Sequence, residues 1–514
     1  MTQNNLAQDL EWEGFSTPAA LQENCHPSVS DRRATTTVVI ERDSQLDLRL
    51  TIESLSSPRD DDEAVDPGDE PVAGIWQRLK VVELESYGAL YQCTQLPDAT
   101  TLTDHYSGAT GLRRVTEVFE LQRVERSWPN GKLVSRGGRL PSSRPPAPPS
   151  WTSDWYVNGP GRKALFPRSS ARTTKRVFTR RRPGKSVTFR EGAIAPSGSS
   201  CDHLRITVPG GHLVISKVPD EYGPAWAGPI GLEFHGDCQN DRYLRDGIAE
   251  ILSFLLGRPL IRVGSTSYDR EGFSLTESAQ SPGVIGLRER CQLASKPPVA
   301  LGWAHVELES LLKKAIPRYM KCRTIYKLSD ALRLYWIACE SPLESSLPIY
   351  SAALETIEKA WSRQHPSKRQ TKFISTKVFR KFFGAALKNA RRAAENEDNL
   401  RRVVDAMYEA NNPSTMRARM DIFYQGLGLQ IGKVERGAIT ARGSRAHGDI
   451  GTMSGEEPTH LNELMHPIAY RGLLNRIVLA VLGLDCEYVD YTVAGQPTRE
   501  INDAAGGLEY SCDG

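Results

Sequence analysis

Much of the first 218 residues alternates between apolar and polar positions with a period of two, which is the spacing of half-buried β-strands. The stretches that show it are TTTVVIERD (35–43), LDLRLTIESL (46–55), RLKVVELESYGALYQCTQL (78–96), RRVTEVFELQRVERSW (113–128) and HLRITVPGGHLVISKV (203–218). The last stretch contains Pro209, Gly210 and Gly211 at its centre, a composition typical of a tight β-hairpin turn. The pattern therefore predicts a β-rich region that includes at least one hairpin.

The spacing changes near residue 240, where apolar residues recur three and four positions apart, as on one face of a helix. In NDRYLRDGIAEILSFLLGRP, Asn240 or Asp241 can cap the start, and Gly257 followed by Pro259 can end the helix. This pattern predicts one helix. The following PLIRVG is expected to form a strand, and STSYDREG a turn.

From residue 304 onwards the helical spacing continues to near the end of the chain. Helices are predicted over 305–321, 328–340, 346–363, 374–394, 397–410, 414–426, about 436–448, and 459–483. In the third of these, Ser346 is expected to cap the start and Pro348 to lie in the first turn. Several amphipathic helices with short connections are typical of a bundle. The highly charged stretch 380–402 is interpreted as a solvated helical excursion from that bundle.

Changes in composition mark the boundaries between these regions. GGRLPSSRPPAPPSW (137–151) is typical of an extended proline-rich linker. The predicted fold class is α+β and multidomain, with a β-rich N-terminal region followed by a C-terminal helical bundle. The expected parts are a β-rich domain (1–135), the proline-rich linker with a basic segment (136–200), a β/α continuation (201–300), the helical domain (301–495) and a C-terminal tail (496–514).

The overall composition is that of an ordinary globular protein. The chain has 514 residues, 39% of them hydrophobic, and a net charge of +3, which is too small to indicate a nucleic-acid partner by itself. Its nine cysteines are dispersed without CxxC pairs, a usage typical of reduced thiols in the cytosol. The N-terminus has no pattern of a signal peptide, and the apolar stretch RIVLAVLGLDC is too short for a membrane span. A cytoplasmic protein without membrane contact is expected.

One segment is strongly basic. Residues 162–190 contain eleven Lys or Arg and no Asp or Glu, with Phe166, Phe178 and Phe189 between them. Such a segment can hold a phosphate backbone by charge and stack on bases. An exposed basic insertion without a defined ligand is the other interpretation. The candidate nucleic-acid-binding residues here are Lys175, Arg176, Arg180, Arg181, Arg182 and Lys185.

The densest candidate chemistry lies in ARGSRAHGDI (441–450), where Arg442 and His447 are five residues apart. A histidine can take the proton from a ribose 2′-hydroxyl or give one to the leaving oxygen, and a guanidinium can hold the phosphate. On one helix five residues correspond to roughly 140° around the axis. Either Arg442 lies at the helix entrance, or another surface completes the site, as at a two-fold dimer interface.

The motif RGSRAHGD resembles the R-x4-H signature of HEPN-domain ribonucleases. LPIYSAALETIEKAW is similar to the second core helix of that family. LLNRIVLAVLGLDCEYVDY resembles the terminal helix of its ApeA-like branch, and ILSFLLGRPLIRVGSTSYDREG resembles the region before the bundle. The resemblance covers about 230–495.

The resemblance implies a HEPN-like bundle and a dimeric or larger, metal-independent endoribonuclease of anti-phage defence by abortive infection. Its RNA substrate would come from host or phage, with transfer RNA among the candidates, and a phage-encoded trigger would activate it. Arg442 would then bind phosphate, His447 would act as general acid and base, Arg445 would add a phosphate contact, and Glu355 is the nearest candidate for a further polar residue. Glu355 lies nearly opposite the apolar stripe of its predicted helix, so a solvent-facing position is also open.

The match departs from the family at Gly443, where Asn, Asp or His is usual. A non-catalytic nucleic-acid-binding or sensor protein with a degenerate site is therefore the alternative. The sequence holds no phosphate loop, His460 and His466 lack metal-ligand spacing, and His235 with Cys238 is only a two-ligand fragment. No metal and no cofactor are expected.

Overall fold

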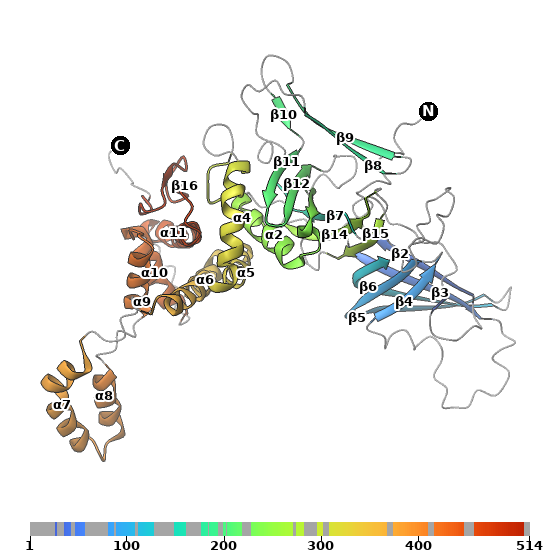
Figure 1. Cartoon of the computed structure of the whole chain (residues 1–514). Coiled ribbons are helices and arrows are strands. Elements are labelled where there is room, and N and C mark those ends of the chain that lie inside the picture. The colour runs from blue at the N-terminus through green and yellow to red at the C-terminus, as the bar shows by residue number, and fades with distance from the viewer. Residues whose placement is uncertain are drawn as a thin grey trace, which may run out of the picture. The chain divides into compact units, whose positions relative to one another are not determined.

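The computed structural model describes residues 26–27, 35–42, 47–56, 81–86, 89–107, 112–127, 149–160, 176–182, 185–193, 199–201, 203–217, 228–270, 274–281, 296–301, 308–366, 374–409, 416–446 and 457–507, some of them by their backbone alone. The chain divides into two compact units, a β-rich one (1–297 and 301–316) and a helical one (298–300 and 317–514). Figure 1 shows the strands of the first and the helices of the second. The α+β, multidomain character predicted from the sequence is confirmed at this level.

The β-rich unit is built on one large antiparallel sheet. Its strands are β1 (His26–Pro27), β2 (Thr35–Arg42), β3 (Leu48–Ser56), β4 (Val81–Ser86), β5 (Ala89–Ser107), β6 (Leu112–Ser127), β7 (Trp151–Val157), β11 (His203–Val208), β12 (Gly211–Lys217), β13 (Ile230–Gly236), β14 (Ile261–Tyr268) and β15 (Ser274–Gln280). Their order is β1-β4-β5-β6-β15-β14-β7-β13-β12-β11, with β3 paired to β6 and β2 to β3. The long β6 pairs with β5 along one edge, while β3 and β15 share its other edge.

Strand β7 lies between β13 and β14 in this sheet, and all seven of its residues are buried. The sequence had placed it inside the 136–200 linker, and this assignment is wrong for 151–157. This strand was missed from the sequence because WTSDWYV carries a central aspartate. A buried strand accommodates an aspartate only where hydrogen-bonding or oppositely charged groups contact its carboxylate. Asp154 has them, since Arg245 donates to it at 2.6 Å and the Ser265 hydroxyl also at 2.6 Å. Burial nonetheless raises the pKa of Asp154, against the opposing effect of Arg245 and Arg262.

Two predicted elements of this unit are confirmed closely. Helix α2 spans Arg242–Leu256; the Asp241 side chain accepts from the Leu244 N–H at 2.9 Å, and Gly257 ends it with a φ of 66°. The β11–β12 hairpin turns at Pro209 and Gly210, since Val208 pairs with Gly211. The predicted turn in STSYDREG is wrong in its first half, because β14 continues through Tyr268 by pairing with both β7 and β15.

The basic segment contributes to a second, smaller sheet. Strands β8 (Arg176–Arg182), β9 (Lys185–Ala193) and β10 (Ser199–Cys201) pair in the antiparallel order β10-β9-β8. No secondary structure was predicted for the basic segment from the sequence, whereas the structure pairs β8 and β9 within this sheet.

From residue 308 onwards the described helices are α4 (Leu308–Ile325), α5 (Leu328–Glu340), α6 (Leu343–Gln364), α7 (Thr376–Ala393), α8 (Asp398–Glu409), α9 (Met416–Gly426), α10 (Lys433–Ala446) and α11 (Glu457–Val481). They correspond one to one with the predicted helices. Helix α6 packs against α5, α10 and α11, and it buries Leu347, Leu354, Ile357 and Trp361. Among the helices of the described ranges, none is long and apolar enough to cross a bilayer.

The predicted cap of α6 is wrong. The helix begins at Leu343 after Pro342, and Ser346 is a buried residue whose N–H donates to the Pro342 carbonyl at 3.0 Å. The fixed φ of a proline suits it to a helix start, and here it moves the start upstream of the serine.

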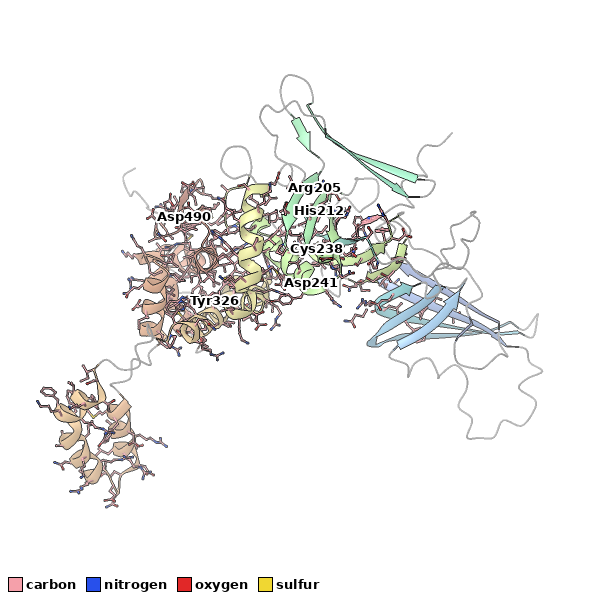
Figure 2. All side chains as sticks on the ribbon, viewed as in Figure 1. Arg205, His212, Cys238, Asp241, Tyr326 and Asp490 are labelled. Carbon is pink, nitrogen blue, oxygen red and sulfur yellow. The ribbon has the colours of Figure 1, made fainter. Side chains whose placement is uncertain are left out.

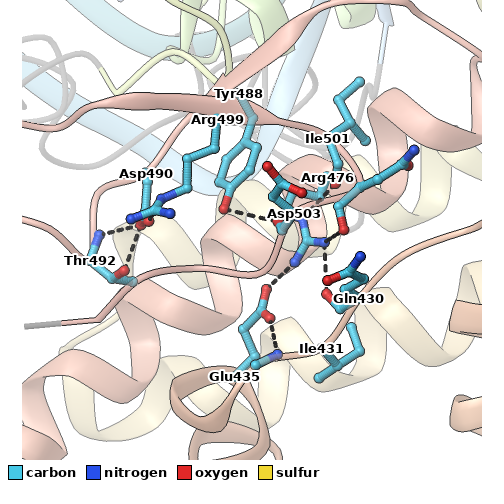
Figure 3. A network of polar contacts seen from close by, with 12 residues as sticks. Gln430, Ile431, Glu435, Arg476, Tyr488, Asp490, Thr492, Arg499, Ile501 and Asp503 are labelled. Carbon is cyan, nitrogen blue, oxygen red and sulfur yellow. Dashed lines mark hydrogen bonds and ion pairs between the residues drawn. The ribbon is translucent and has the colours of Figure 1, made fainter.

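The segment predicted as a C-terminal tail is folded as far as residue 507. Strands β16 (Glu487–Val489) and β17 (Thr498–Glu500) pair with each other. The backbone of Ile501 and Asn502, directly after β17, contacts the buried Arg476 of α11. Arg476 donates to the carbonyls of Ile501, Gln430 and Asn502 and pairs with Glu435 (Figure 3). Residues 498–507 therefore pack on the helical unit, with Ile501, Ala505 and Gly507 buried.

Candidate functional site

Helices α6 and α10 bring two predicted site residues together across 87 positions of sequence. Arg442 Nη2 donates to Glu355 Oε1 at 2.5 Å, with the side chains 29% and 19% exposed. The solvent-facing interpretation of Glu355 is therefore wrong. The helical wheel located the apolar stripe of α6 correctly, but it had no information that α10 packs beside the polar flank.

The motif left two alternatives, an Arg442 at the entrance of its helix or a site completed by another surface. The position of Arg442 excludes the first. Helix α10 begins at Lys433, so Arg442 is nine residues past the start and not at the entrance. The helix ends at Ala446, directly before His447, which lies outside the described residues. Arg445 is in the last turn of α10, and its side chain is also outside the described part. A site completed by another surface is the remaining alternative.

Further polar side chains surround the Glu355 carboxylate. Lys359 Nζ lies 3.3 Å from Oε2, and the Ser351 hydroxyl donates to Oε1 at 3.4 Å. The Tyr470 hydroxyl of α11 shares a hydrogen bond with Ser351; burial raises the pKa of Tyr470, while Ser351 and the charge of Arg442 lower it in part. The raised pKa keeps the Tyr470 phenol protonated at neutral pH.

Sequence reasoning named neither Ser351, Lys359 nor Tyr470. Ser351 and Lys359 each lie four residues from Glu355 on α6, so the helical period would have found them once Glu355 was chosen. Tyr470 comes from α11, and only packing decides which residue of α11 reaches α6.

The arrangement has one clear chemical capacity. Glu355 holds the Arg442 side chain while leaving it partly exposed, so an incoming phosphate can reach the guanidinium. Within the ranges described here, no group of three or more His, Cys, Asp or Glu side chains is placed to hold a metal ion.

The basic candidates of the β-rich unit are placed by backbone only. Arg176, Arg180, Arg181 and Arg182 lie on β8 and Lys185 on β9, with Arg182 opposite Lys185 in register. Lys175 lies outside the described residues.

A second polar cluster, which the sequence did not predict, lies across β11, β12 and β13 (Figure 2). The buried Glu233 forms an ion pair with His235, whose ring stacks on that of His212 with centroids 4.4 Å apart. Arg205 Nη2 lies 3.3 Å from His212 Nε2. The period of two on β13 puts Glu233 and His235 on one face, which is the signal that could have found the pair.

Cys238 lies beside this cluster but is a poor nucleophile. Its thiol donates to the His235 carbonyl at 3.0 Å, and burial raises its pKa. The sulfur is therefore protonated at neutral pH, and a thiolate is the reactive form.

The environment of His212 leads to a test of this cluster. Two effects lower the pKa of His212 below its ordinary 6.5. Desolvation by burial is the larger, and the positive charge of Arg205 is the smaller. Arg205→Gln is expected to raise that pKa without restoring 6.5, because the desolvation remains. NMR titration of ¹³C-labelled histidine would measure it, with Arg242→Gln on α2 as the control. An unchanged pKa in Arg205→Gln would contradict the assignment.

Comparison with known proteins does not extend this description. No family model matches the chain, and no curated protein and no solved structure matches it either.

Proposed function

We propose that this chain is a metal-independent endoribonuclease with a HEPN-like helical domain, whose site is built around Arg442 and His447. The observation that carries the proposal is the Arg442–Glu355 pair, which holds a partly exposed guanidinium five residues before His447 in the sequence. The R-x4-H motif and its flanking helices supply the rest of the support.

In this proposal Arg442 binds the scissile phosphate and stabilises the charge that develops on it. His447 takes the proton of the ribose 2′-hydroxyl, whose oxygen attacks phosphorus, or gives a proton to the 5′-oxygen that leaves. The products are a 2′,3′-cyclic phosphate and a 5′-hydroxyl. Glu355 is the positioning residue that sets the direction of the guanidinium.

The proposed active form is a dimer or larger assembly. Because Arg442 lies well inside α10, a continuation of the same helix would turn His447 roughly 140° away from it. Two copies of the motif facing each other would supply an arginine and a histidine to one cleft. The β-rich unit would then act as the sensor or regulator, responding to a phage-encoded trigger in the cytoplasm.

RNA cleavage in the presence of EDTA tests this function. The purified protein, with and without extract of phage-infected cells, is expected to cut RNA, and His447→Ala is expected to abolish the cutting. His105→Ala, in the β-rich unit, serves as the control. Full cleavage by His447→Ala would refute the assignment, and RNA binding without turnover in the unaltered protein would favour the non-catalytic alternative.

A further inference from the structure

Helix α7 carries its charge on one side. It contains no acidic residue, and six cations lie along it, namely Lys377, Arg380, Lys381, Lys388, Arg391 and Arg392. All six are exposed. At 100° per residue they fall within an arc of roughly 120°. We call this arc the basic face of α7.

The opposite side of α7 is apolar and is only partly covered by α8. Leu387 is buried, the rings of Phe379 and Phe383 lie 5.2 Å apart, and Phe382 is 69% exposed. The earlier interpretation of 380–402 as a solvated excursion is therefore incomplete, since the hairpin also exposes large apolar side chains. The centres of the apolar and basic arcs lie roughly 150° apart.

Most of the basic face is available to a ligand. Arg391 pairs with Asp405 at 3.3 Å, and its guanidinium lies over the Tyr408 ring. Among the described residues, no ion pair involves Lys377, Arg380, Lys388 or Arg392. Like charges four residues apart, as Lys388 and Arg392 are, destabilise a helix. Stability of the hairpin therefore does not account for this face.

We infer that the basic face of α7 docks the sugar–phosphate backbone of RNA. A row of exposed cations, most of which form no ion pair, binds a polyanion by releasing its counterions, whatever the base sequence. That the polyanion is RNA rests on the function proposed above.

An anionic lipid surface is the competing ligand, because a helix with cations on its polar face and exposed side chains such as Phe382 and Phe383 on the other is also typical of a membrane interface. RNA is the ligand inferred here because it is the substrate of the function proposed above. Binding to anionic vesicles is therefore one outcome of the test.

The test measures binding separately from cleavage. Fluorescence anisotropy of the full chain with a single-stranded RNA of 2′-O-methyl riboses, which lacks the attacking hydroxyl, is recorded over a range of salt concentrations. Lys388→Gln with Arg392→Gln is expected to weaken binding roughly 10- to 25-fold at 0.1 M salt and to reduce the salt slope by about 1.4. The charge-matched control is Arg401→Gln with Arg402→Gln on α8, where Arg401 pairs with Asp398 at 2.8 Å.

The outcomes separate this inference from the proposed function. Equal affinity and slope in the α7 and control variants would overturn it, even if the protein cleaves RNA. An α7-dependent loss of binding supports it, even if no cleavage is found. Loss of binding to phosphatidylserine vesicles with RNA affinity intact would overturn it in favour of a membrane surface. Circular dichroism of both variants confirms that the helices are retained.

Discussion

Replacing Arg442 by alanine is expected to reduce RNA cleavage by roughly 100- to 1000-fold, the usual effect of removing one group that stabilises transition-state charge. The fold is expected to survive, because the Arg442–Glu355 pair is partly exposed and such pairs contribute only about 0–1 kcal/mol. Single-turnover cleavage and a thermal melt of the same preparation would measure the two effects.

Two further variants make the result specific to the guanidinium. Arg442→Lys keeps the charge but loses the forked geometry, so an intermediate rate is expected. Arg436→Ala removes an exposed arginine of the same helix and is expected to leave the rate unchanged. Cleavage by Arg442→Ala within twofold of the unaltered protein would exclude Arg442 from the site.

The second large effect is on stability and concerns Glu435. Its carboxylate pairs with the buried Arg476 and accepts from the Gly432 N–H at 2.8 Å, which caps the start of α10 (Figure 3). Glu435→Ala would leave a buried guanidinium without its counter-charge, a change that costs about 3–5 kcal/mol. For a unit of this size the melting temperature is expected to fall by roughly 6–20 °C.

The matched comparison is an exposed pair in the same unit. Arg401→Ala breaks the Arg401–Asp398 contact and is expected to change stability by less than about 1 kcal/mol. Removing both buried partners, in Glu435→Ala with Arg476→Ala, is not expected to restore stability, because the carbonyls of Ile501 and Gln430 lose the donor that Arg476 supplies. A melt of Glu435→Ala within 2 °C of the unaltered protein would contradict this account.

The candidate site illustrates what could be predicted locally. Arg442 and His447 were named from residue type and motif, because the chemistry of a guanidinium and an imidazole does not depend on the fold. Glu355 was named only from the resemblance of its helix to the second core helix of the HEPN family. The contact between Arg442 and Glu355 was not predicted, since 87 residues separate them and only the packing of α10 on α6 closes that distance. Tyr470 was missed for the same reason, whereas Ser351 lies four residues from Glu355 on α6 and could have been found from the helical period.

By itself, the sequence determined a helix or a hairpin wherever the spacing of apolar residues and the capping or turn residues at the ends predict the same element. The β11–β12 hairpin, α2 with its Asp241 cap and Gly257 stop, and the succession of helices from 308 to 481 all follow from interactions within a few residues. Only the tertiary structure determined whether a segment is buried when the residues that contact it are distant in the sequence. WTSDWYV forms an interior strand in which Arg245 pairs with Asp154, and residues 498–507 pack on the helical unit, where Arg476 donates to the carbonyls of Ile501 and Asn502. A buried charge is tolerated only where a remote partner meets it, and that partner is not visible in the local pattern.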